Sequence, residues 1–240
     1  MVSVTATDMD FRTLNEQIRQ AGAVCEITGC LGQRFIGAGM SKGTVTVSGG
    51  VPGNALGAYL NGAVIVVNGN AQDAVGDTMN NGKIVIHGNI GDAAGYAMRG
   101  GAVYIKGNAG YRAGIHMKEY KGKVPLMVIG GHAGSFLGEY QAGGVIVVLG
   151  LDGAEKIVGN FPCTGMHGGK LFLRSDCRGI CFPDQVTARP ATDADRAEID
   201  RYVAEYCRLF GGNKEEYLDH PFTVVTPDSK NPYKRLYVAN

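Results

Sequence analysis

A glycine phrase that recurs at a nearly constant step constrains this chain more than any other feature. Residues 88–95 have the pattern G-x-x-G-x-x-x-G and follow an apolar run at 83–86. Self-similarity with a period near 20 residues is typical of solenoid proteins, in which each repeat packs only against its neighbours. We therefore interpret residues 88–95 as part of one coil in a stack.

The copies of the phrase define the period. Their final glycines are Gly57, Gly76, Gly95, Gly114, Gly138 and Gly159, at steps of 19, 19, 19, 24 and 21 residues. Apolar runs accompany them at residues 44–47, 63–67, 83–86, 102–105, 126–129, 145–149 and 170–173. An irregular first copy spans residues 24–37, and the polar stretch 115–123 accounts for the long step as a surface loop.

Parallel stacking explains this pattern better than a series of hairpins. The chain has 38 glycines, against about 17 expected for an average composition. Asn-Gly and Gly-Gly pairs such as 81–82 and 100–101 supply positive φ values for turns. Every strand is followed by the same phrase, whereas alternate strands of a meander would differ. The expected fold is all-β, a parallel β-helix of about seven coils.

Asparagine follows the first glycine of successive copies, at Asn70, Asn89 and Asn108. In a parallel stack these side chains would form a ladder whose amides hydrogen-bond between coils.

The two ends of the chain differ from the repeats. Residues 10–21 predict a short N-terminal helix with Gly22 at its C-terminal cap. After residue 174 the composition becomes more charged, and Thr192 with Asp195 resembles a capping box that starts a second helix. Extended segments are expected at 222–225 and 235–238. We predict a β-helix domain over residues 1–182 and an α/irregular tail over 183–240 that caps the open end of the solenoid.

Composition and charge exclude several functional classes. The formal net charge of +1 does not indicate nucleic acid or an anionic membrane surface as a partner. No apolar stretch has the length of a signal peptide core or a membrane span. Six scattered cysteines do not form a secreted disulfide framework. A cytoplasmic protein is the expectation.

Four residues form the strongest candidate metal site. Cys163, His167, Cys177 and Cys181 could together supply the ligands of a zinc ion, with Cys25 and Cys30 as a separate pair. The spacings differ from those of known zinc motifs, and free cysteine is common in protein cores. We assign no metal ligand from the sequence, and whether these four residues bind a metal stays open.

The remaining residues do not define a catalytic centre. The glycine phrase lacks the spacing of a dinucleotide-binding loop, and Gly169-Lys170 lacks the residues of a phosphate-binding loop. Nothing close in sequence would activate Ser135 or Ser175. The histidines are dispersed, with His116 and His132 as the exposed candidates and His87, His167 and His220 elsewhere. We assign no catalytic residue, no cofactor-binding residue and no cofactor.

The repeated phrase, with its Val/Ile strands and Gly-Gly turns, resembles the GXGXG domain family over about residues 24–175. This family includes the C-terminal domain of the glutamate synthase large subunit and the β-helical subunit of formylmethanofuran dehydrogenase. Residues 107–114, 134–150 and 163–169 are similar in particular to the stand-alone glutamate synthase form. The resemblance implies a right-handed β-helix without its own catalytic centre.

The resemblance also implies partners. In the family enzyme, glutaminase chemistry uses an N-terminal cysteine, and ammonia transfer uses FMN and an iron–sulfur cluster on another domain. Residue 2 here is Val2, and no cysteine run of the cluster type is present. The resemblance thus indicates a scaffolding subunit of a glutamate synthase-type complex. Its partners would be an amidotransferase-like subunit and an FMN/iron–sulfur subunit. The chain could also associate with copies of itself. The equivalent subunit of a formylmethanofuran dehydrogenase-like enzyme and a free-standing enzyme are the alternatives.

Overall fold

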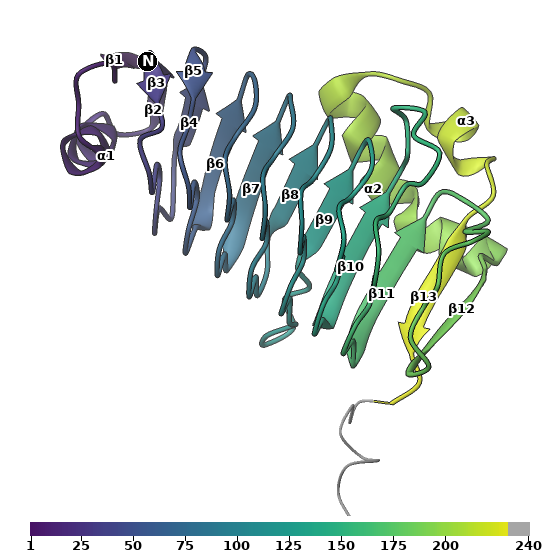
Figure 1. The fold of residues 1–240 in the computed structure, drawn as a ribbon. Helices are drawn as coiled ribbons and strands as arrows, with labels where there is room; N and C mark the ends of the chain where they lie inside the picture. Colours follow the sequence, from purple (N-terminus) through teal and green to yellow (C-terminus); the bar gives the residue numbers. More distant parts are fainter. Residues whose placement is uncertain (230–240) are drawn as a thin grey trace, which may run out of the picture.

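One long sheet runs through the protein (Figure 1). A computed structural model describes residues 1–229. Its eleven-stranded sheet has the order β1-β2-β4-β6-β7-β8-β9-β10-β11-β13-β12, and β3 pairs with β5 in a small second sheet. The elements are β1 (Val2–Thr5), α1 (Phe11–Gln20), β2 (Val24–Thr28), β3 (Cys30–Leu31), β4 (Thr44–Val47), β5 (Gly50–Val51), β6 (Asn61–Val67), β7 (Asn81–Ile86), β8 (Ala102–Ile105), β9 (Leu126–Ile129), β10 (Ala142–Val148), β11 (Gly168–Leu173), β12 (Val186–Pro190), α2 (Asp193–Phe210), α3 (Lys214–Leu218) and β13 (Thr223–Pro227).

The strands from β1 to β11 in this long sheet are all parallel, which confirms the predicted β-helix of about seven coils. Their register places equivalent apolar residues directly above one another. One such column is Cys25, Val45, Ile65, Ile84, Val103, Met127, Ile146 and Leu171. Every member is buried.

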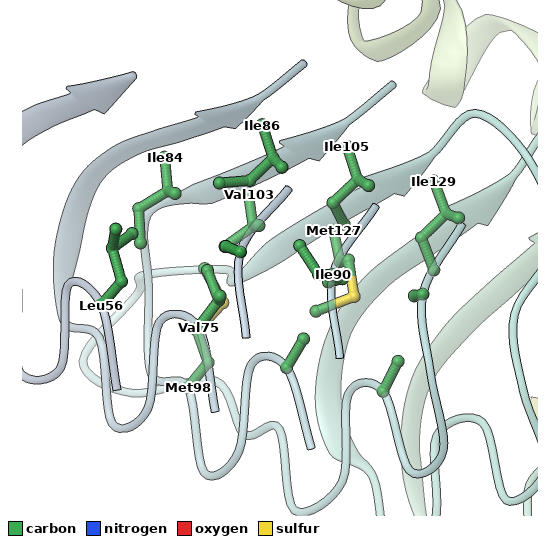
Figure 2. Close-up of a cluster of buried hydrophobic side chains, with 14 of the residues drawn as sticks. Leu56, Val75, Ile84, Ile86, Ile90, Met98, Val103, Ile105, Met127 and Ile129 are labelled. Atoms are coloured by element: carbon green, nitrogen blue, oxygen red, sulfur yellow. The ribbon is translucent and has the colours of Figure 1, made fainter. Parts of the chain in front are cut away.

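The interior of the solenoid is filled by side chains from opposite sides of each coil. Figure 2 shows Ile84, Val103 and Met127 of the strands pointing toward residues of the returning segments, such as Val75 and Met98. These residues belong to one continuous cluster. Complete burial of such a side chain stabilises the fold by about 1.5–3 kcal/mol, and each coil obtains this burial only from its neighbours.

The asparagine ladder is present in a different form from the one expected. The Oδ1 atom of Asn70 accepts a hydrogen bond from the backbone N–H of Asn89 at 2.8 Å, and Asn89 accepts one from Asn108 at 2.8 Å. The side chains thus bond to the backbone of the next coil, not to one another. A second ladder, which the sequence analysis did not identify, joins Asp73 to Asp92 and Asp92 to Tyr111 in the same way.

The assignment of Gly159 as a final glycine of the phrase is wrong. A Cβ atom on Gly159 would meet the backbone of Gly134, and Gly134 is a middle glycine of its own copy. The final position of the last coil is occupied by Cys163, whose φ is 63°. The glycine pattern alone points to Gly159, whereas the stack places a cysteine in that conformation.

The predicted N-terminal helix is confirmed as α1. The Asp10 carboxylate caps it by accepting hydrogen bonds from the N–H groups of Arg12 and Thr13, and Gly22 follows the C-cap residue with a φ of 79°. Strand β1, which the sequence analysis did not identify, precedes this helix and adds one more parallel strand to the sheet.

The C-terminal tail, for which a cap on the open end of the solenoid was expected, covers the solenoid in two ways. Strand β13 pairs antiparallel with β11, and β12 pairs with β13, so these strands continue the sheet beyond the last coil. Helix α2 instead lies across the outer face of the C-terminal strands (Figure 1). Thr192 and Asp195 form its predicted capping box. The extended segment expected at 235–238 lies outside the described residues.

Outward-facing apolar residues explain the position of α2. Tyr104, Val128 and Val147 are buried on the side of the sheet that faces away from the solenoid interior, where they pack against Ile199 and Val203. Strand β4 instead alternates buried residues with the half-buried threonines 44 and 46. A second core therefore forms only where the strands carry apolar residues on both faces.

The contact between successive coils predicts how a middle glycine contributes to stability. A Cβ atom on Gly134 would lie 2.7 Å from the carbonyl group of Gly110 and 2.9 Å from the nitrogen of Tyr111. Gly134→Ala should therefore destabilise the protein by about 1–3 kcal/mol, measured as a lower thermal unfolding temperature. Gly69→Ala is the matched control, because a Cβ there meets nothing within 4 Å. Equal unfolding temperatures for the two variants would contradict the account of close coil packing.

Candidate interaction surface

Each coil turns a corner through an unusual alternation of backbone conformations. In the coil that contains Arg112, Gly114 and His116, these three residues have φ values of 58°, 72° and 56°. The residues between them do not share the positive φ. L-residues disfavour this left-handed conformation by about 1–2 kcal/mol each, so the fold must impose it.

Hydrogen bonds between coils impose the alternation. The N–H of Arg112 donates to the carbonyl of Ser135 in the following coil, and the N–H of His116 donates to that of Glu139, both at 2.9 Å. The N–H of Gly114 donates in the opposite direction, to the carbonyl of Ala94 at 2.7 Å. Each corner is thereby bonded to the coil before it and the coil after it.

The same geometry explains why the central residue is glycine. A Cβ atom on Gly114 would lie 2.3 Å from Cδ1 of Ile146 in the solenoid interior. The two outer positions accept larger side chains, and these form two rows along the corner. The first row is Phe35, Ala55, Ala74, Ala93, Arg112, Phe136 and Phe161, and the second is Gly39, Tyr59, Thr78, Ala97, His116, Tyr140 and Gly165.

The composition of the rows changes along the solenoid. Alanine occupies the first row in three successive coils, whereas the next three coils carry Arg112, Phe136 and Phe161 in the same conformation. The backbone therefore does not require a large side chain at these positions. We define the corner patch as Tyr111, Arg112, His116, Phe136, Tyr140 and Phe161.

Ring contacts connect the corner patch from coil to coil. The ring centroid of Phe136 lies 5.2 Å from that of Tyr111 and 5.2 Å from that of Phe161. His116 and Tyr140 are stacked with centroids 5.2 Å apart and an interplanar angle of 11°. A Cβ atom on Gly165 would lie 2.3 Å from the Tyr140 ring, so glycine at that place makes room for the ring. Phe161 nevertheless remains 62% exposed.

An ion pair holds Arg112 of the first row in place. The Nε atom of Arg112 donates to Oε2 of Glu139 at 2.6 Å, and the Glu139 side chain is only 8% exposed. The guanidinium group of Arg112 also lies 4.6 Å from the ring centroid of Tyr111 and 5.4 Å from that of Phe136. The patch thus presents flat aromatic faces and a cation held in a fixed position.

The structure does not bring the four candidate metal ligands together. Cys163 and Cys177 are buried in the main core, and burial raises the pKa of both thiols. Nδ1 of His167 lies 2.9 Å from the carbonyl oxygen of Gly165, and Cys181 is exposed. Over residues 1–229, no group of three His, Cys, Asp or Glu side chains is close enough to hold a metal ion. A four-ligand site of these residues is therefore not formed.

The other histidine and serine candidates have structural partners. His87 packs edge-on against Phe210, and burial together with nearby Lys106 lowers its pKa. Nδ1 of His132 lies 2.5 Å from Oδ2 of Asp152. The hydroxyl oxygen of Ser135 accepts a hydrogen bond from the N–H of Asn160. Ser175 caps the N–H of Cys177 in the same way. Among the histidines and serines considered in the sequence, only His116 lies in the corner patch.

Two of the clefts on the described surface bear on catalysis and lie away from the corner patch. One of about 360 Å³ lies between the segment with Cys177 and Phe182 and the edge formed by Arg189 and Phe222. The other, of about 370 Å³, lies between the asparagine ladder and the end of α2 near Gly211. Neither contains an activated nucleophile, since the thiol of Cys177 is buried and its pKa is raised.

The sequence analysis missed the corner patch. Its residues come from three successive coils, and those that lie in the repeated phrases, such as Arg112 and Phe136, occupy variable positions between the glycines. The available signal for Arg112, His116, Phe136 and Tyr140 was their position, two residues before or after the final glycine of their phrases, together with the change from alanine to larger residues in the first row.

The parallel coils and their glycine-centred corners define a class of β-solenoid built on a repeated glycine motif. Residues 5–228 match the model of the GXGXG motif family, and the chain belongs to that family. A relative is the uncharacterized protein MJ1350 of Methanocaldococcus jannaschii, which is 41% identical over 253 residues that cover 100% of this chain and 97% of that protein.

A solved structure has a similar fold. It is a chain of the formyltransferase/hydrolase complex (FhcABCD) of Methylorubrum extorquens in complex with methylofuran, with a TM-score of 0.63 and 24% identity. The match covers 83% of this chain and 71% of that chain. Among residues 1–229, no helix is both long and apolar enough to cross a membrane.

The corner patch predicts an unusual mutational result. Phe161→Gly removes an exposed ring but also relieves a left-handed conformation that glycine adopts freely. We expect the free energy of unfolding to stay within about 1 kcal/mol of the wild-type value, measured by denaturant titration. Phe172→Ala, at a fully buried ring, should by comparison cost about 3–5 kcal/mol. A comparable loss for Phe161→Gly would mean that the exposed rings serve the fold.

Proposed function

We propose that this protein is a scaffolding subunit without its own catalytic centre in a glutamate synthase-type complex. Its partners would be an amidotransferase-like subunit and an FMN/iron–sulfur subunit, which the solenoid holds in fixed relative positions. The complex would act in glutamate biosynthesis and nitrogen metabolism. We place it in the cytoplasm, and self-association of the solenoid is compatible with this role.

One observation supports the choice of a glutamate synthase-type complex. The three sequence phrases that resemble the stand-alone glutamate synthase form, at 107–114, 134–150 and 163–169, are far apart in the chain. Inter-coil hydrogen bonds bring them to one corner, where Arg112 N–H donates to Ser135 O and Tyr140 N–H donates to Thr164 O. A shared surface, rather than a shared fold alone, is what a common set of partners would preserve.

A rigid stack suits the proposed role. Hydrogen bonds and buried columns tie each coil to both neighbours, so the distance between surface positions on different coils varies little. The tail is attached in the same way, through the β11–β13 pair and through the ion pairs Lys83–Glu205 and Lys170–Glu198. Subunits bound along such a rod would keep their relative orientation during turnover.

The second candidate is the equivalent β-helical component of a formylmethanofuran dehydrogenase-type enzyme. The fold similarity to a chain of the FhcABCD complex favours it. At 24% identity that similarity concerns the fold, so this candidate ranks second. A free-standing enzyme that uses one of the clefts ranks third.

Purification of the complex tests the proposal. The affinity-tagged chain should co-purify from its native cells with an amidotransferase-like subunit and a flavin-containing subunit, identified by mass spectrometry. Glutamine-dependent formation of glutamate from 2-oxoglutarate should require the partners, and removal of this chain should lower the rate at least tenfold. A molybdopterin-containing partner would instead support the second candidate, and turnover by the isolated chain would support the third.

A further inference from the structure

We propose that the corner patch and a strip of cations beside it bind an acidic segment of a partner protein. This inference rests on the proposed function for the idea that the partner is a subunit of the same complex. The basic strip consists of Arg99, Lys118, Lys121 and Lys123.

The aromatic half of the surface is not explained by folding. Phe136 and Phe161 occupy a left-handed conformation that three preceding coils fill with Ala55, Ala74 and Ala93, whereas the first coil carries Phe35. A chain that needed only to close its corners would keep alanine or glycine there. Backbone strain combined with a contiguous cluster of rings, here Tyr111, Phe136 and the exposed Phe161, is characteristic of positions that contact a ligand or partner.

The basic strip lies directly beside the second row. Arg99 and Lys118 each follow a second-row position by two residues, and they occupy equivalent places in successive coils. The N–H of Arg99 donates to the carbonyl of Met79, and that of Lys118 donates to the carbonyl of Met98. The loop that carries Lys121 folds back at Lys123, whose side chain packs against Gly100.

The cations of the strip lack carboxylate partners. None of the four has a carboxylate within ion-pair distance in the part of the chain that the structure describes. Lys118, Lys121 and Lys123 are exposed. By contrast, Arg112 in the adjoining patch is paired with Glu139.

Arg99 has a hydrogen-bond donor without an acceptor among the described residues. Its Nε atom is buried and has no hydrogen-bond acceptor among the described residues, while its guanidinium group lies 5.9 Å from the ring centroid of Tyr120. Buried donors in folded proteins are nearly always paired, because an unpaired one loses its hydration without compensation. Because Nε is covered by the chain itself, a carboxylate from a bound segment would pair with the three exposed lysines and with the guanidinium group of Arg99 rather than with Nε.

The charge of the surface distinguishes among three kinds of binding partner: a second copy of the chain, nucleic acid and an acidic protein segment. A second copy of this chain would bring the same basic strip to a symmetric contact, and like charges would repel. Nucleic acid would require a wider basic surface than a chain with a net charge of +1 and a pI near 7.6 offers. An acidic protein segment matches both halves, since its carboxylates can pair with the strip while its apolar side chains cover the exposed rings.

Site-specific photo-crosslinking tests the proposal in the full-length chain in its native cells. The photoreactive residue p-benzoylphenylalanine replaces Tyr140, and mass spectrometry identifies the attached peptide. We expect a peptide from another protein with more Asp and Glu than Lys and Arg around the link. The matched control places the same group at Tyr59, which has a φ of 56° and is 60% exposed but lies coils away from the patch. This control should give no such product.

Charge reversal provides the second arm. The double variant Lys118→Glu/Lys121→Glu should lower the crosslink yield at least tenfold at an unchanged unfolding temperature. Lys42→Glu, at an exposed lysine of an N-terminal coil, should leave the yield unchanged. An unaltered yield in the double variant overturns the proposal. The proposal is also overturned if the crosslinked product contains only a second copy of this chain, nucleic acid, or a peptide without net negative charge. It is likewise overturned if no crosslinked product forms.

The result separates this inference from the proposed function. A crosslink to an acidic segment of a protein that is neither amidotransferase-like nor flavin-containing keeps the binding surface and rejects the glutamate synthase assignment. Co-purification of those two subunits that is unaffected by the charge reversal keeps the assignment and rejects the surface.

Discussion

Hydrogen bonds between successive coils are the interaction on which the rest of this structure depends. At each corner, outer residues such as Arg112 and His116 donate forward, while the central Gly114 donates backward. This alternation holds residues in a conformation that an isolated chain would avoid. No coil is stable alone, because both its backbone pairing and the burial of its apolar column come from its neighbours. The solenoid is therefore rigid along its length.

Because backbone hydrogen bonds fix the corner, the side chains on its outer surface can vary without changing the fold. The central position faces the interior and is filled by glycine in every coil but the last, whereas the outer positions accept side chains as different as the buried Ala55 and the exposed Phe161. The C-terminal end of the stack and its outward apolar face are covered by other elements. Strand β13 pairs with the last parallel strand, and α2 covers the outward apolar face around Val128 and Val147. The corner of the C-terminal coils stays exposed beside these coverings, as the exposure of Phe161 illustrates.

The fold could be predicted from the sequence to a large extent, and the surface could not. The parallel strands, the helix at 11–20 and the capping box at Thr192 all follow from local patterns. Among the residues considered for chemistry, Cys163 and Cys177 proved to be core residues, and only His116 belongs to the corner patch. Motif searches favour residue types with known chemistry, whereas this surface is defined by rings and cations that are separated by whole coils.

The period, the strand positions and the need for glycine at most corners follow from the amino-acid sequence alone, because they depend on local backbone preferences and on the spacing of apolar residues. The sequence led to the wrong residue at Gly159, where the stack places Cys163 in the glycine conformation. Which side chains face outward, and which of them meet, depends instead on how the coils stack. The reason is physical: the sign of φ at each corner residue is imposed by hydrogen bonds to coils about 20–25 residues away, and that sign sets the direction of the side chain.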